Sequence, residues 1–291
     1  MRYLAIIVSI LIFNVSEVFS QDQSELQKNL YSNDAQIRMS SAFKLWNFQS
    51  TAQVNDQLLL ESVLAQALWG ESLMVVGGLA PAGSIRGFHP VILENLLNKM
   101  QKQQSIQNTD LGWFMVTEGE FTETALLGAY RTPYDFIIYS RESIKRILKN
   151  KEIRNELRNL GFRYLSDSDV ERFILEFRDS VRRVYIGGTV IETRAFTIAY
   201  GIMMGYPLTD VLAFADGVDQ SSNIGNFTTH PLFPTVGAFR TRSPFSEEVR
   251  EIRVRGNKIV DIFLHLLARG HTYLDILNSS NALFCETVFS G

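Results

Sequence analysis

The stretch Ser72-Leu73-Met74-Val75-Val76-Gly77-Gly78 decides the interpretation of the fold. A short apolar run that stops at glycines is typical of a buried β-strand followed by a tight turn. The run Arg183-Val184-Tyr185-Ile186-Gly187-Gly188 has the same order, and a helical pattern follows both runs. Strand, glycine turn and helix therefore occur twice, which predicts a sheet covered by helices.

The rest of the chain beyond residue 71 alternates between strand-like and helix-like spacing of apolar residues. We expect further strands at 111–117, 135–139 and 251–255, and helices at 90–100, 141–160, 169–181, 190–204, 207–215 and 259–267. Such alternation favours an α/β or α+β fold that is rich in helix and holds a small mixed sheet of about five short strands.

The first twenty residues carry the pattern of a secretory signal peptide. Arg2 precedes an apolar run from Leu4 to Val15, and Val18 and Ser20 are the small residues that a signal peptidase inspects. The run is shorter than the about 20 apolar residues that a membrane-spanning helix needs. We therefore expect a soluble mature protein that is secreted or periplasmic and has no membrane contact after cleavage.

The mature chain is expected to have two parts. Residues 21–70 carry two helical patterns, which we interpret as an N-terminal helical hairpin. The pattern changes at residue 71, so residues 71–291 are expected to form the α/β or α+β domain.

The composition excludes several classes of protein. The chain has 291 residues, of which 46% are hydrophobic, so it is too apolar to be disordered. Its formal net charge of -3 gives no general attraction to nucleic acid. One cysteine excludes an internal disulfide framework, and the four scattered histidines form no metal-binding motif. We therefore expect no metal site, no cofactor and no nucleic-acid partner.

The two glycine turns are candidate binding sites. Backbone N–H groups at a glycine turn before a helix can hold an anion, which makes Gly77, Gly78, Gly187 and Gly188 candidate ligand-binding residues. Neither turn has the lysine and hydroxyl of a phosphate-binding loop, and tight turn geometry alone explains the same glycines. Glu192, near the start of the helix after the second turn, could face the same pocket.

The long segment from 216 to 245 has no helical period and is the second candidate site. Asp216 and His230 are candidate catalytic residues, because a carboxylate and an imidazole can exchange protons near neutral pH. Arg240 could bind an anionic group through its planar guanidinium. Alternatively, the aromatic residues of the segment pin it to the core while its polar residues cap turns.

The segment from Arg141 to Arg163 is strongly basic, with eight basic and three acidic residues. In a chain that is acidic overall, we interpret this segment as a solvated helix face rather than a nucleic-acid site.

Three functions from different classes are compatible with these patterns. The leading one is a secreted or periplasmic protein that binds a small anionic ligand between the glycine turns and the long segment. The alternatives are a metal-independent hydrolase that uses His230 and Asp216, and an exported structural protein that binds a protein partner. The sequence leaves open whether the chain is an enzyme.

Overall fold

The computed structural model describes residues 23–47, 54–85, 88, 90–117, 134–185, 190–216, 224–233, 239–240, 247–279 and 284. The expected signal peptide, residues 1–20, lies outside these ranges. The chain divides into two compact units, Met1–Gln66 and Ala67–Gly291.

The described part of the first unit is helical. Its elements are a helix over residues 23–29, α2 (Ala35–Asn47) and α3 (Asp56–Ala67), whose last residue already belongs to the second unit. The hydroxyl of Tyr31 donates to Glu61 Oε2 at 2.7 Å and joins the segment before α2 to α3. Residues 48–53, between α2 and α3, lie outside the described part, so the helical hairpin that we expected over 21–70 stays a prediction.

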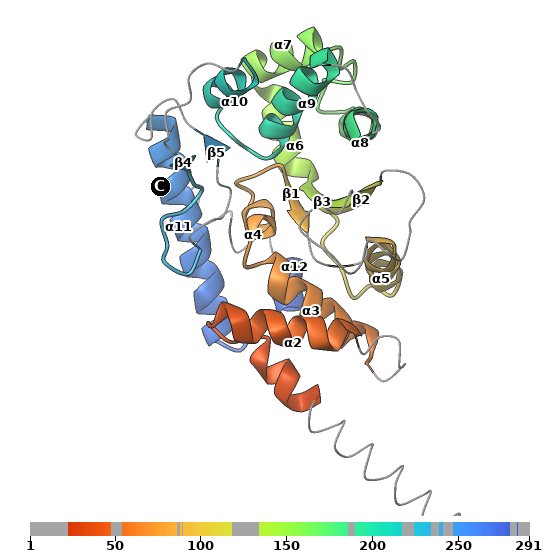
Figure 1. The fold of residues 1–291 in the computed structure, drawn as a ribbon, viewed down its shortest axis with the longest axis vertical. Helices are drawn as coiled ribbons and strands as arrows, with labels where there is room; N and C mark the ends of the chain where they lie inside the picture. The colour runs from red at the N-terminus through yellow and green to blue at the C-terminus, as the bar shows by residue number, and fades with distance from the viewer. Residues whose placement is uncertain are drawn as a thin grey trace, which may run out of the picture. The chain divides into compact units, whose positions relative to one another are not determined.

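The second unit contains many helices and few strands (Figure 1). Its elements are α4 (Glu71–Val76), β1 (Ala82–Ile85), α5 (Pro90–Lys102), β2 (Leu111–Thr117), β3 (Tyr134–Ser140), α6 (Arg141–Lys149), α7 (Lys151–Asn159), α8 (Val170–Tyr185), α9 (Val190–Met203), α10 (Leu208–Ala215), β4 (Ile224–Gly225), β5 (Phe239–Arg240), α11 (Glu247–Ala268) and α12 (Tyr273–Asn278).

A three-stranded antiparallel sheet in the order β1-β3-β2 lies at the centre of this unit. The central strand β3 pairs Tyr139 with Ala82 on one side and with Gly112 on the other. In the described residues, β4 and β5 form a separate pair of two residues each. The helix-rich fold with a small sheet is confirmed, and a single mixed sheet of about five strands is not confirmed in the part of the chain that the structure describes.

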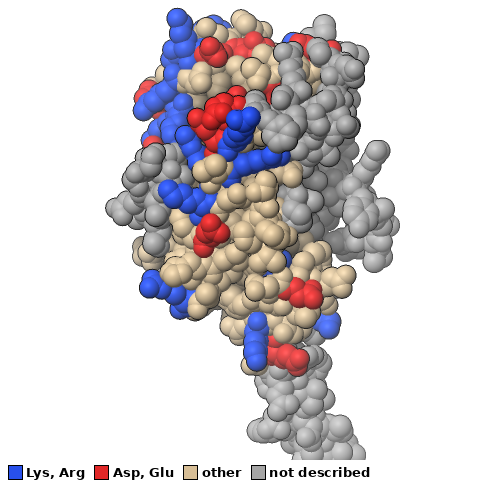
Figure 2. Space-filling model, turned by 90° about the vertical axis from the view of Figure 1, so that its left-hand side faces the viewer, with Lys and Arg blue, Asp and Glu red and all other residues tan. Residues whose placement is uncertain are grey.

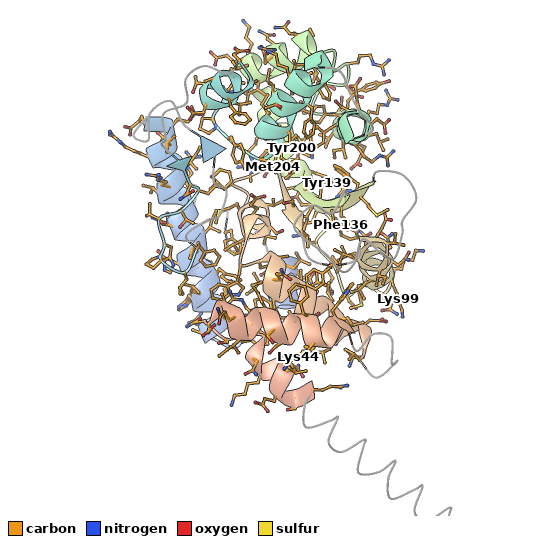
Figure 3. All side chains as sticks on the ribbon, viewed as in Figure 1. Lys44, Lys99, Phe136, Tyr139, Tyr200 and Met204 are labelled. Carbon is orange, nitrogen blue, oxygen red and sulfur yellow. The ribbon has the colours of Figure 1, made fainter. Side chains whose placement is uncertain are left out.

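One face of the sheet packs against α8 and α9. Phe114 and Tyr139 belong to the same hydrophobic core as residues of these helices. Phe114 meets Phe177 of α8 edge to face, with ring centres 6.2 Å apart. Figure 3 shows Tyr200 and Met204 on the face of the sheet that carries the side chain of Tyr139. This core joins the sheet to the group of helices from α6 to α10.

The opposite face of the sheet packs against α4 and α5. Phe136 is buried, and it lies on this face because successive side chains of a strand point to opposite faces. Helix α5 covers it with an apolar stripe at helical spacing, formed by the buried residues Leu93, Leu96, Leu97 and Met100. The helix that we predicted from this stripe is therefore confirmed.

The apolar run at 72–76 forms helix α4 and not the predicted strand. All five residues of the run are buried, and a short run that is buried on every side has no period that separates strand from helix. The N–H groups of Gly78 and Leu79 donate to carbonyls of α4 and close the helix in a Schellman motif. Gly78 has φ +73°, a left-handed conformation that favours glycine.

Two other predicted strands are also helical. Residues 183–185 form the end of α8, and residues 251–255 lie inside α11. Alternation of Ile252 and Val254 with arginines suggested a strand, but the buried residues of α11 follow helical spacing: Val249, Gly256, Ile259, Val260, Phe263 and Leu266. At the first run the expected strand is a helix. At the second run the residues before the gap at 186–189 are helical too. The expected order of strand, glycine turn and helix is therefore not found in the described residues.

The remaining predicted elements are confirmed, with one division. Strands β2 and β3 and helices α8, α9 and α10 lie where their apolar patterns predicted them. The helix expected over 141–160 is divided into α6 and α7 at Asn150. The Oδ1 atom of Asn150 accepts from the N–H groups of Glu152 and Ile153 at 2.9 and 3.2 Å, so Asn150 caps the start of α7.

Helix α12 is joined to the segment before β2 by hydrogen bonds over a long sequence separation. The amide of Asn278 accepts from the N–H of Gln107 and donates to the carbonyl of Ser105, both at 2.8 Å. The amide of Asn108 donates to the carbonyl of Leu277 at 2.9 Å across 169 positions. These bonds hold α12 beside the loop between α5 and β2.

A buried polar network joins the end of β3 to the start of α6. The hydroxyl of Ser140 donates to Asp110 Oδ2 at 2.7 Å and accepts from the N–H of Ser143 at 3.1 Å. Asp110 Oδ1 accepts from the N–H of Glu142 at 2.7 Å. A carboxylate and a hydroxyl of the chain therefore satisfy the N–H groups at the positive end of α6.

We expect Ser140→Ala to lower the free energy of unfolding by about 1–3 kcal/mol, because it removes the cap of α6 and leaves Asp110 Oδ2 without its hydroxyl donor. Chemical denaturation measures this change. The control is Ser168→Ala, at an exposed hydroxyl that bonds to Ser166, where we expect a change within about 0.5 kcal/mol. Equal effects of the two variants would contradict the role of this network.

Candidate functional site

The first glycine turn has no amides left for an anion. The N–H groups of Gly77 and Gly78 donate to carbonyls of α4, and the turn lies at the C-terminal end of that helix, where carbonyl groups point outward. The carbonyl of Gly78 accepts from Arg146 Nη2 at 2.7 Å. This turn therefore contacts a cation of the chain, and the physical argument for an anion at Gly77 and Gly78 no longer applies.

The second glycine turn falls where the structure is not described. Gly187 and Gly188 lie in the gap at 186–189, and Glu192 belongs to α9 with a side chain outside the described part. Their assignment as ligand-binding residues stays a prediction.

Asp216 and His230 have separate partners. Asp216 Oδ1 accepts from Arg194 Nε at 2.9 Å and Nη2 at 2.7 Å. The Nδ1 atom of His230 accepts from the N–H of Leu232 at 3.2 Å, and the His230 N–H donates to Thr228 Oγ1 at 2.9 Å. Among the described residues no carboxylate contacts the His230 ring. The acid–base pair of the hydrolase hypothesis is therefore not formed there.

Aromatic residues anchor the segment 226–233 in the core of the second unit. Phe227 is buried, and its carbonyl oxygen comes so close to α11 that a Cβ atom at Gly256 would lie 1.7 Å from it. Phe233 is buried too and stacks on Trp69, with ring centres 5.1 Å apart, and meets Phe263 edge to face. Gly256 therefore lets the segment lie directly against the backbone of α11.

Hydrogen bonds from Asn257 fix the polar part of the segment on α11. Asn257 Oδ1 accepts from Thr228 Oγ1 at 2.6 Å and from the N–H of Thr229 at 2.9 Å. Asn257 Nδ2 donates to Thr229 Oγ1 at 3.0 Å. This side of α11, with the segment that lies on it, is the candidate functional site.

Arg253 lies on the same side of α11, one turn before Asn257, because residues three and four apart share a helix face. Its Nε atom is buried and has no hydrogen-bond acceptor in the described part of the chain. The exposed arginines nearby are different, since Arg250 pairs with Glu247 and Arg255 with Glu251. Arg253 as a whole is half-buried, but a buried N–H group normally has an acceptor, because leaving it without one costs free energy. The sequence analysis missed Arg253.

The short pair of β4 and β5 brings Arg240 close to this site in the backbone. Ile224 pairs with Arg240, and Ile224 lies just before the segment that docks on α11. Figure 1 shows β4 and β5 beside the first half of α11. The side chain of Arg240 lies outside the described part, so its contact with a ligand stays a prediction.

The first half of α11 carries charges of both signs (Figure 2). The pKa of Glu248 is raised above its usual value, mainly because burial removes water from it, and further because Asp210, Glu251 and Glu152 are negative. Ionised Glu248 is therefore less favourable in the folded protein than in the unfolded chain. The stability that this group contributes is complete below about pH 4 and is lost as the pH rises through its raised pKa.

We expect Glu248→Gln to raise the melting temperature at pH 7, because it removes a carboxylate whose ionised form is penalised by burial and by negative neighbours, and to leave it unchanged near pH 3, where Glu248 is protonated in both states. Melting curves at the two pH values measure the difference. Glu247→Gln is the control, since Glu247 lies beside it in the same first helical turn and pairs with Arg250. A stabilisation of the same size in the control, or one that persists at pH 3, would contradict this assignment.

Comparison with known proteins gives one match. Residues 84–225 match the model of a family described as Protein of unknown function (DUF3793), which covers the chain from the end of β1 to β4. No curated protein and no solved structure matches the chain.

In the described residues, no helix is long and apolar enough to cross a membrane. The same residues contain no group of three His, Cys, Asp or Glu side chains that could hold a metal ion.

Proposed function

We propose that this protein is exported and binds a small anionic ligand at α11, with Arg253 as the cationic contact. The observation that carries this proposal is the buried Nε atom of Arg253, which has no acceptor in the described part of the chain. A buried N–H donor without an acceptor loses its hydration without compensation, and an oxygen atom of an anion would supply that compensation.

The donors around this site favour a carboxylate or phosphate ligand. The planar guanidinium of arginine matches the two oxygen atoms of either group. Because Nδ1 of His230 accepts a hydrogen bond, the neutral ring carries its proton on Nε2, for which no acceptor is found in the described residues. In this proposal His230 is a hydrogen-bond donor at the edge of the site and not a catalytic base.

We expect Arg253→Met to abolish stabilisation by anions without destabilising the ligand-free protein. The wild-type melting temperature should rise with inorganic phosphate or citrate relative to chloride at the same ionic strength, because a ligand that binds the folded state stabilises it. Methionine retains most of the apolar stem of arginine but has no N–H groups, so removal of a buried donor without an acceptor leaves stability equal or higher. Thermal shift assays of both proteins measure these effects.

Arg250→Met is the matched control, because Arg250 is exposed on the same helix and already pairs with Glu247. It should retain the full response to the anion. A loss of more than about 2 kcal/mol in ligand-free Arg253→Met would instead make Arg253 a structural residue. No response of the wild type to any carboxylate or phosphate would contradict the proposed function.

Export is supported by the charged start, apolar run and small residues of positions 1–20. We expect a host that secretes the full chain to release a protein that begins at Gln21, and Ile10→Arg, in the middle of the apolar run, to prevent release. N-terminal sequencing of the released protein tests this. A released protein that retains residues 1–20 would contradict cleavage by a signal peptidase.

A further inference from the structure

Helix α7 separates its charges onto two sides. Leu157 is buried in the core, so the side that carries it faces inward. At about 100° per residue, Lys151, Arg154 and Arg158 fall together on one outer side of the helix. Glu152 and Glu156 fall together on the other outer side. We call the side with the three cations, Lys151, Arg154 and Arg158, the basic face of α7.

The basic face has no acidic partner in the described part of the chain. Lys151 and Arg154 form no ion pair there, and Arg158 Nη1 donates to a neutral group, Asn155 Oδ1, at 2.9 Å. Six cations on the neighbouring elements do have acidic partners. The pairs are Arg141 with Glu171, Lys145 with Glu142, Arg163 with Glu176, Arg172 with Asp169, Arg178 with Asp179 and Arg194 with Asp216.

The spacing of these cations and the position of Lys151 are unfavourable for α7 by itself, although Arg158 lies in the last turn, where the helix dipole favours a cation. Lys151 is the first residue of the helix, at the end where the helix dipole is positive. Arg154 lies three residues after Lys151 and four before Arg158, which are the spacings at which like charges on a helix repel. Sequence features that oppose local stability are expected where a function requires them.

We propose that the basic face of α7 binds an acidic segment of a protein partner. Carboxylates of such a segment can approach this one side of the helix and relieve the repulsion among the three cations. Charge complementarity favours an acidic protein segment over an extended anionic surface. A bilayer or a nucleic acid would also meet Glu152 and Glu156 on the same short helix, and these carboxylates would repel it. Among the exposed large apolar residues of the described chain, none lies on α7 to insert into a bilayer.

The test is binding of a fluorescein-labelled peptide of ten glutamates to the mature chain, measured by fluorescence anisotropy. We expect a reversal of the three charges, Lys151→Glu, Arg154→Glu and Arg158→Glu together, to weaken binding at least tenfold. The matched control reverses Arg163, Arg172 and Arg178, which changes the net charge equally at ion-paired positions, and should weaken binding less than threefold. Arg158→Glu alone should give an intermediate loss, and covers the case in which the triple variant does not fold.

The outcomes separate this proposal from its rivals. An equal loss in the two triple variants would mean that net charge alone attracts the peptide, and would overturn the proposal. Stronger binding to vesicles of anionic phospholipid than to the peptide would overturn it in favour of a membrane surface. No binding by the wild type would also overturn it. Arg253→Met should bind the peptide normally, so this result does not depend on the anion site at α11.

Discussion

The hydrogen bond between Ser140 and Asp110 joins the sheet of the second unit to its helices. β3 is the central strand, both of its faces are covered by helices, and its last residue is the cap of α6. Asp110 stands at the start of the neighbouring strand β2 and bonds to both Ser140 and the first turn of α6. One carboxylate therefore fixes the register of a strand and the starting point of a helix at once. The helices from α6 to α10 are positioned on the sheet by this junction and by the apolar core above it.

The elements with a clear period could be predicted from the sequence, and those without one could not. The stripe of Leu93, Leu96, Leu97 and Met100 faces one side, so a helix was the only consistent interpretation. The run at 72–76 is buried all around, and neither period appears in it. The division of the 141–160 helix depended on Asn150, whose capping bonds are local, although its sequence context alone did not mark the break.

Sequence analysis singled out the long segment of the candidate site but missed Arg253, because of how part of α11 was interpreted. The long segment was singled out, but its His230 has local backbone and hydroxyl partners rather than a carboxylate. Arg253 was missed because residues 251–255 were interpreted as a strand, which places Ile252 and Val254 inside and the arginines outside. In the helix, Val254 is 67% exposed and the Nε atom of Arg253 is buried. The helical spacing of Val249, Gly256 and Val260 around Arg253 was the signal that could have found it.

The bonds between α12 and the loop before β2 have a consequence for folding. Asn108 and Leu277 are 169 positions apart, so docking of α12 closes a loop that holds most of the second unit. Contacts over such separations require the closure of a large loop, and proteins rich in them fold slowly. Before that closure, the groups of Ser105, Gln107 and Asn108 that bond to α12 are hydrated, and Asp110 ties this loop to Ser140 and α6 by its carboxylate. Attachment of the C-terminal helix therefore adds non-local hydrogen bonds to the segment that leads into β2, and its loop-closure entropy is one contribution to the folding barrier of this unit.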